Sequence, residues 1–184
     1  KGADLGTNLF TGPYRTSILA DAYRDALRAT SVDQTFITDM ERYPPSYDRP
    51  TLWVLSPIGN GGNIAGVLAL QLPIDGINNV MTGDKGWEED GLGATGETYL
   101  AGPDKLMRSV SRELLTNPDT YVADVVANGT PTDVAEREVD VGGSVLLQPV
   151  DTLAVNRALA AESGVATDDD YIGPTSLVAY MPLD

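Results

Sequence analysis

The chain contains neither cysteine nor histidine among its 184 residues. Thiol and imidazole groups supply many of the nucleophiles, general bases and zinc ligands of enzymes, and histidine also holds haem iron. Their absence removes these mechanisms, together with zinc sites and haem ligation, and leaves few kinds of enzyme. We predict a protein that is not an enzyme and that uses no cofactor and no metal ion. The lack of cysteine is compatible with an oxidising extracytoplasmic compartment.

Basic residues are also scarce. Lys and Arg together number 12 against 27 Asp and Glu, which gives a formal net charge of −15 at pH 7. Nucleic acid and anionic membrane surfaces repel such a chain, so we expect neither as a partner. No apolar run approaches the roughly 18 residues that a membrane-spanning helix needs.

The stretch GLGATGETYL, residues 91–100, has three glycines at the spacing of the dinucleotide-binding fingerprint G-x-G-x-x-G. That fingerprint needs a buried strand before the glycines and a helix after them, because the helix N-terminus holds the pyrophosphate. Here an acidic, polar segment precedes the glycines, and ETYLAG after them favours extended structure. The pattern therefore predicts a glycine-rich turn that leads into a hairpin.

The first part of the chain predicts one helix and an antiparallel sheet. Apolar residues recur at helical spacing over 17–29, with Thr16 or Ser17 as the cap. Strands are predicted over 35–43, over 51–58 and, after a turn at 60–63, over 64–74.

Two faces alternate along the strand predicted at 64–74. Leu68, Leu70 and Leu72 share one face with Ile74, whereas Val67, Ala69 and Gln71 share the other. We expect the leucine face to lie in the core, and the smaller, partly polar face to leave room for a ligand.

The second part predicts a hairpin about residues 102–105, three helices and a final strand. The helices are expected over 117–127, 132–138 and 151–164, the last one ending at Gly164. PTLWVLSPI and PTSLVAYMPL share an opening Pro-Thr, an apolar strand and a closing proline, which indicates two similar modules. We place the modules at 1–82 and 83–184, with fewer strands in the second.

Several segments resemble the extracytoplasmic double Cache sensor domains of bacterial receptors. They cover most of the chain in the order of that family: LGTNLFTGPY, IAGVLALQLPIDGINNVM, GLGATGETYLAGPDKLMRSVSR, VNRALAAESGV and YIGPTSLVAYMPL. GETYLAGPDKLMRS is the most specific segment, and it looks like the start of the membrane-proximal module in receptors with cyclase, chemotaxis or kinase outputs.

The resemblance implies an α+β fold of two PAS-like modules, each an antiparallel sheet flanked by helices and truncated at the ends of this sequence. It further implies a homodimeric full-length receptor, attached to the membrane through helices outside this sequence. The arginine, tryptophan, tyrosine and aspartate signature of amino-acid-binding members cannot be placed here, so the ligand class stays open.

Candidate ligand-binding residues gather in the first module. Aromatic rings beside a carboxylate suit a small cation, a polyol or an amine, and the alternative is a rigid loop with tyrosines packed on the sheet edge. In the second module Arg108 can clamp a carboxylate, and the alternative is an ion pair with Glu97 or Asp169. The predicted set is Asp39, Tyr43, Tyr47, Trp53, Gln71 and Arg108.

These features predict an extracytoplasmic sensor that binds a small molecule and passes a conformational change to a cytoplasmic output. A protein-interaction module that docks a periplasmic binding protein is the main alternative. A hydrolase that uses paired carboxylates such as Asp39 and Glu41 is a third hypothesis.

Overall fold

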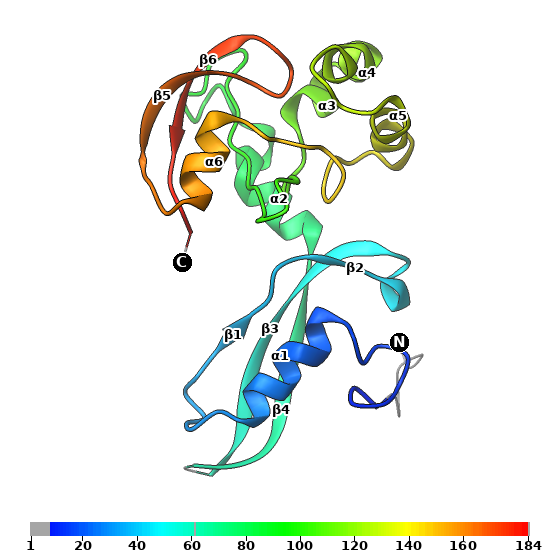
Figure 1. Cartoon of the computed structure of the whole chain (residues 1–184), viewed down its shortest axis with the longest axis vertical. Helices are drawn as coiled ribbons and strands as arrows, with labels where there is room; N and C mark the ends of the chain where they lie inside the picture. The colour runs from blue at the N-terminus through cyan, green and yellow to red at the C-terminus, as the bar shows by residue number, and fades with distance from the viewer. Residues whose placement is uncertain (1–7, 61, 184) are drawn as a thin grey trace. The chain divides into compact units, whose positions relative to one another are not determined.

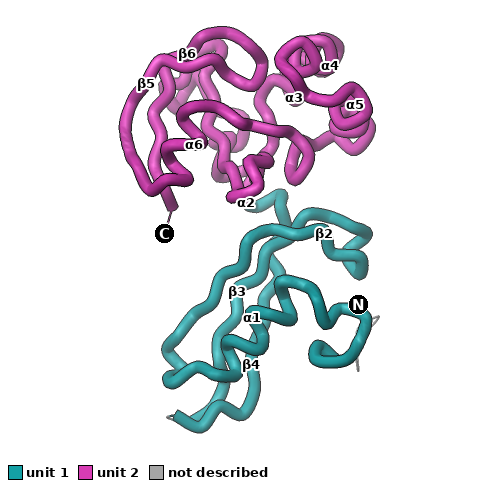
Figure 2. Tube along the Cα trace, in the orientation of Figure 1, with its two compact units in different colours: residues 1–76 teal, residues 77–184 magenta. Residues whose placement is uncertain are grey.

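The computed structural model describes residues 8–60 and 62–183, and the chain forms two compact units, residues 1–76 and 77–184 (Figure 2). The division falls inside helix α2 (Ile74–Thr82), slightly before the boundary at residue 83 that the sequence suggests. Each unit holds one antiparallel sheet and helical segments, so the fold class is α+β.

Unit 1, residues 1–76, is built around one long central strand. β3 (Arg49–Asn60) pairs along its length with β4 (Asn63–Pro73), and its other edge pairs with β1 (Phe36–Ile37) and β2 (Glu41–Tyr43). The 3-10 helix η2 (Pro44–Ser46) joins β2 to β3. Helix α1 (Ile18–Leu27) packs on β3 and β4 (Figure 1).

Local side-chain chemistry sets the boundaries of these elements. The Ser17 hydroxyl accepts a hydrogen bond from the Ala20 N–H and caps α1 as predicted. The single strand predicted over 35–43 is wrong, because the chain leaves the ladder between β1 and β2. There the Thr38 hydroxyl and the Asp39 carboxylate bond to nearby backbone groups and replace regular ladder hydrogen bonds.

The sheet of unit 1 buries the face opposite to the one predicted. Trp53 and Leu55 of β3 lie in the core, and their register partners on β4 are Gln71 and Ala69. Leu68, Leu70 and Leu72 point the other way and keep 49, 53 and 40% of their surface exposed. The expectation of a leucine core face is therefore wrong, because α1 covers the face that carries Trp53 and Leu55.

Unit 2, residues 77–184, combines several helices with a two-stranded sheet. Its strands β5 (Gly164–Asp169) and β6 (Thr175–Tyr180) pair antiparallel, which is fewer strands than in unit 1, as predicted. After the end of α2 the described elements are η3 (Gly83–Lys85), α3 (Arg112–Thr116), α4 (Pro118–Ala127), α5 (Thr132–Val141) and α6 (Leu153–Leu159).

Two expectations for unit 2 need correction. The segment 97–112 turns about 102–105 through a hydrogen bond from the Lys105 N–H to the Gly102 carbonyl, but its pairing is limited to isolated bridges. Helix α6 ends at Leu159, and Gly164 instead begins β5. Trp87 is 6% exposed, and the Arg112 guanidinium lies over its ring.

Candidate functional site

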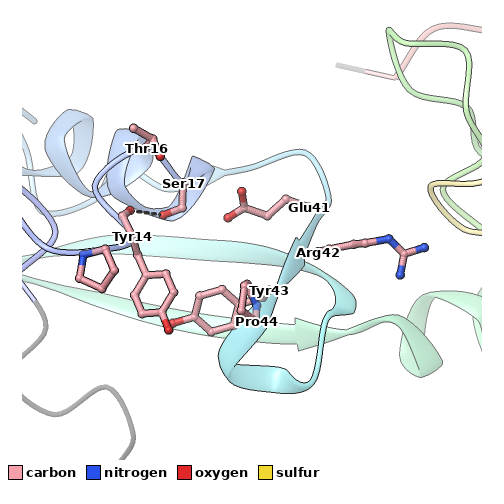
Figure 3. Close-up of a pocket in the computed structure, with 8 residues that line it drawn as sticks. Tyr14, Thr16, Ser17, Glu41, Arg42, Tyr43 and Pro44 are labelled. Atoms are coloured by element: carbon pink, nitrogen blue, oxygen red, sulfur yellow. Dashed lines mark hydrogen bonds between the residues drawn. The ribbon is translucent and has the colours of Figure 1, made fainter.

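A small pocket lies in unit 1 where α1 begins beside β2 (Figure 3). Its volume is about 170 Å³, enough for a molecule of a few non-hydrogen atoms. The Ser17 cap and the β2 pairing fix its two walls. The lining residues are Pro13, Tyr14, Thr16, Ser17, Glu41, Arg42, Tyr43 and Pro44.

Glu41 is the charged group that points toward the start of α1, whereas Arg42 points away (Figure 3). Its Oε2 accepts a hydrogen bond of 3.2 Å from the Ile18 N–H. Its Oε1 is buried and accepts no hydrogen bond from the described residues. Burial raises the pKa of Glu41, and the N–H groups of Ile18 and Leu19 partly oppose that rise.

Aromatic rings form one wall of this pocket. The Tyr14 and Tyr43 ring centroids lie 5.8 Å apart, and Tyr43 meets Trp53 edge-to-face at 5.0 Å. Trp53 Nε1 is buried without a hydrogen bond among the described residues. The pocket thus combines a carboxylate with tyrosine rings, which suits a small cation or a neutral hydrogen-bonding ligand.

The structure brings together part of the predicted unit 1 set. Tyr43 and Trp53 are packed against each other and are nearly buried, and Gln71 lies opposite Trp53 on β4, bonded to Ser46. Asp39 is exposed in the break between β1 and β2. Tyr47 is 86% exposed in a left-handed turn and does not line the pocket.

Sequence reasoning missed two lining residues, Tyr14 and Glu41, as ligand contacts. Glu41 lies two residues before Tyr43 on β2, and residues at that spacing share a strand face, which is a usable signal. Its contact with the start of α1 joins residues 23 positions apart, so only the tertiary structure shows it.

The Arg108 side chain has binding partners within its own chain. The buried guanidinium forms an ion pair of 2.9 Å with Asp104 and donates a hydrogen bond of 3.0 Å to the Leu106 carbonyl. Asp104 is thus an ion-pair partner that the sequence-based alternative did not name.

Replacing Gly102 with alanine is expected to destabilise the protein by about 2 to 3 kcal/mol, because the added Cβ collides with the buried Arg108 guanidinium. Gly143 is the control, since a Cβ there meets nothing within 4 Å. Denaturant unfolding should show G143A within about 0.5 kcal/mol of the parent protein. Equal effects of the two substitutions would contradict the packing of Arg108 on Gly102.

The glycine-rich stretch does not present N–H groups to a phosphate. The Arg112 guanidinium instead donates hydrogen bonds to the carbonyl oxygens of Gly93 and Gly96. It stacks over Trp87, with Cζ 4.7 Å from the ring centroid. A site that offers carbonyl oxygens to a cation has the wrong polarity for a diphosphate. The expectation of a glycine-rich turn without a helix behind it agrees with this structure.

A second, smaller pocket in unit 2 lies beside Glu97 and Arg112, with a volume of about 60 Å³. Glu97 accepts hydrogen bonds from the Tyr171 hydroxyl at 2.6 Å and from the Arg112 N–H at 2.8 Å. Burial raises the pKa of Glu97 to about 7. Both carboxylate oxygens thus hold internal partners, which favours a structural role.

No group of three or more acidic residues placed to hold a metal ion occurs in the described parts of the chain. Within residues 8–60 and 62–183, no helix combines the length and apolar character that crossing a membrane requires. Comparisons of the chain with models of known protein families, with curated proteins and with solved structures find no match.

Proposed function

We propose that this chain is the extracytoplasmic ligand-sensing domain of a bacterial transmembrane receptor, with the ligand bound in the unit 1 pocket. In this proposal the two units are two PAS-like modules. Ligand binding changes the conformation of the domain, and the domain passes that change to a cytoplasmic output. The observation that carries the proposal is one pocket lined by Glu41, Tyr14 and Tyr43, in which Glu41 Oε1 is buried without a hydrogen bond from the described residues.

The chemistry of the pocket favours a small organic amine. An ammonium group supplies hydrogen-bond donors and positive charge for Glu41, and it interacts well with the faces of tyrosine rings. A ligand acts as a signal only if it binds one arrangement of the domain more tightly than another.

A thermal-shift screen with small amines, polyols and organic acids tests this function. An amine present at one hundred times its dissociation constant is expected to add about 2.7 kcal/mol of stability, which raises Tm by roughly 5 to 10 °C for a chain of this size. Glu41→Gln should remove that shift, and Tyr14→Ala should reduce it. Glu88→Gln serves as the control, because Glu88 is exposed and lies outside the pocket.

The outcomes separate the ligand classes. A shift by organic acids that survives Glu41→Gln would contradict the amine site. If Glu41→Gln lowers the Tm without ligand, the difference between samples with and without amine still measures binding, because each variant is its own reference.

The docking module remains a second candidate because unit 1 exposes an apolar sheet face. Leu68, Leu70 and Leu72 lie on it, together with Ile37, which is 71% exposed. Contiguous exposed apolar surface marks protein-binding sites on many soluble proteins. The docking function would be supported if no small molecule raised the Tm of this chain and the chain bound a periplasmic protein through this face. No observed geometry favours the carboxylate hydrolase.

A further inference from the structure

A chain of buried hydrogen bonds links α4, α5 and the segment 143–152 in unit 2. Tyr121, Glu138 and Gln148 are each 0% exposed. The Tyr121 hydroxyl lies 2.6 Å from Glu138 Oε2 and 3.0 Å from Gln148 Oε1. Figure 1 shows α4 and α5 side by side, and this contact lies between them.

The orientation of the Gln148 amide is fixed by its other contacts. Its Nε2 donates hydrogen bonds to the Pro149 carbonyl at 2.8 Å and to the Thr130 hydroxyl at 2.9 Å. A carbonyl oxygen only accepts, so the nitrogen must face Pro149 and the amide oxygen must face Tyr121. Tyr121 therefore sits between two oxygens.

The number of protons decides the state of Glu138. The Tyr121 hydroxyl has one proton, which cannot serve an ionised Glu138 and the Gln148 oxygen together. With Glu138 protonated, the acid donates to the Tyr121 oxygen, and Tyr121 donates to Gln148. Every short contact then carries one proton.

Among the described residues, the Tyr121 hydroxyl is the one hydrogen-bond donor that would stabilise an ionised Glu138. Its Oε1 is buried without a hydrogen bond, and the described residues form no ion pair with it. The Tyr121 hydroxyl approaches Glu138 from α4, and the residues of the segment 143–150 carry no charge. Glu97 adds negative charge that acts on Tyr121. The other charged residues of α5 are exposed: Asp133, Glu136, Arg137 and Asp140.

We propose that Glu138 is held as a neutral acid and that its deprotonation loosens α4 from α5, which makes unit 2 sensitive to pH near neutrality. Burial raises the pKa of Glu138 to about 7 from a reference value of 4.5. The folded state therefore holds the proton more tightly than the unfolded state does. The stability that protonated Glu138 contributes to the folded state is full below about pH 4.5 and is lost as the pH rises through 7. This inference does not depend on the ligand-sensing function.

Amide hydrogen exchange of the full chain at pH 5 and pH 8 tests the proposal, after correction for intrinsic exchange rates. Protection of α4 and α5 is expected to fall roughly 10- to 100-fold at the higher pH. Glu138→Gln should keep the protection and remove most of this dependence, because its amide stays neutral and can donate to Tyr121. Glu136→Gln, an exposed change on the same helix, should behave as the parent protein.

A pH dependence in α4 and α5 that survives Glu138→Gln would overturn the proposal, as would its absence from the parent protein. Should the variant not fold, NMR of the Glu138 side-chain carboxyl carbon in the parent protein decides the question. An apparent pKa above about 6 supports a neutral acid, and a value at the usual 4 to 5 contradicts it.

Discussion

Replacing Arg112 with alanine is expected to lower the free energy of unfolding by about 2 to 4 kcal/mol. The substitution leaves the carbonyl oxygens of Gly93 and Gly96 without their donor, and it uncovers the buried ring of Trp87. A buried polar group left without a partner costs about 1 to 3 kcal/mol, which applies to the half-buried Gly96, whereas the exposed Gly93 carbonyl can bond to water. The lost cation–π contact adds about 1 kcal/mol or more. Denaturant unfolding measures the sum.

Two further variants identify the cause of that loss. Arg112→Lys keeps the positive charge but lacks the planar guanidinium that serves two carbonyls, so it should recover only part of the stability. Arg137→Ala, on the exposed face of α5, should change stability by less than about 0.5 kcal/mol. A loss below 1 kcal/mol for Arg112→Ala would show that the glycine-rich loop does not depend on this guanidinium.

The role of Arg112 shows how far the glycine pattern alone could be interpreted. The residues around the glycines excluded a phosphate site, because no helix begins directly after Gly96. The side chain that organises the loop comes from α3, a five-residue helix. Such a helix is too short for apolar periodicity to reveal it, so the sequence did not predict α3.

Periodicity was sufficient for the longer elements. It predicted α1, α4, α5 and the β3–β4 hairpin close to their observed bounds. It failed at β5, where the sequence GVATDD lacks a strong apolar alternation and ends in two aspartates. That strand exists because it pairs with β6, a contact that a local window does not contain.

In the candidate site, too, the sequence revealed local features and missed those that depend on tertiary contacts. Tyr43 was identified from its strand and does line the pocket, yet its neighbour across the pocket is Tyr14, from the segment before α1. Asp39 was predicted to bind ligand together with Tyr43, but it lies outside the pocket lining, in the break between β1 and β2 where the Thr38 hydroxyl bonds to the Asp39 carbonyl. Local bonding of short polar side chains decided the outcome.

Leu55 and Leu70 lie on neighbouring strands and face opposite sides of the unit 1 sheet. Leu55 of β3 is fully buried beneath α1, whereas Leu70 of β4 keeps 53% of its surface exposed. Leu55→Ala removes buried methyl groups and leaves a cavity, so it should cost about 3 to 4 kcal/mol. Leu70→Ala should cost less than about 1 kcal/mol, chiefly through the lower strand propensity of alanine.

Chemical denaturation of both variants tests which face of the sheet is the core. Similar losses for the two substitutions would mean that the leucine face is also covered in solution. Dilution then separates the causes, because burial between copies of the chain weakens as the protein concentration falls. A large loss at Leu70 alone would restore the orientation expected from the sequence and would contradict the observed packing of α1 on Trp53 and Leu55.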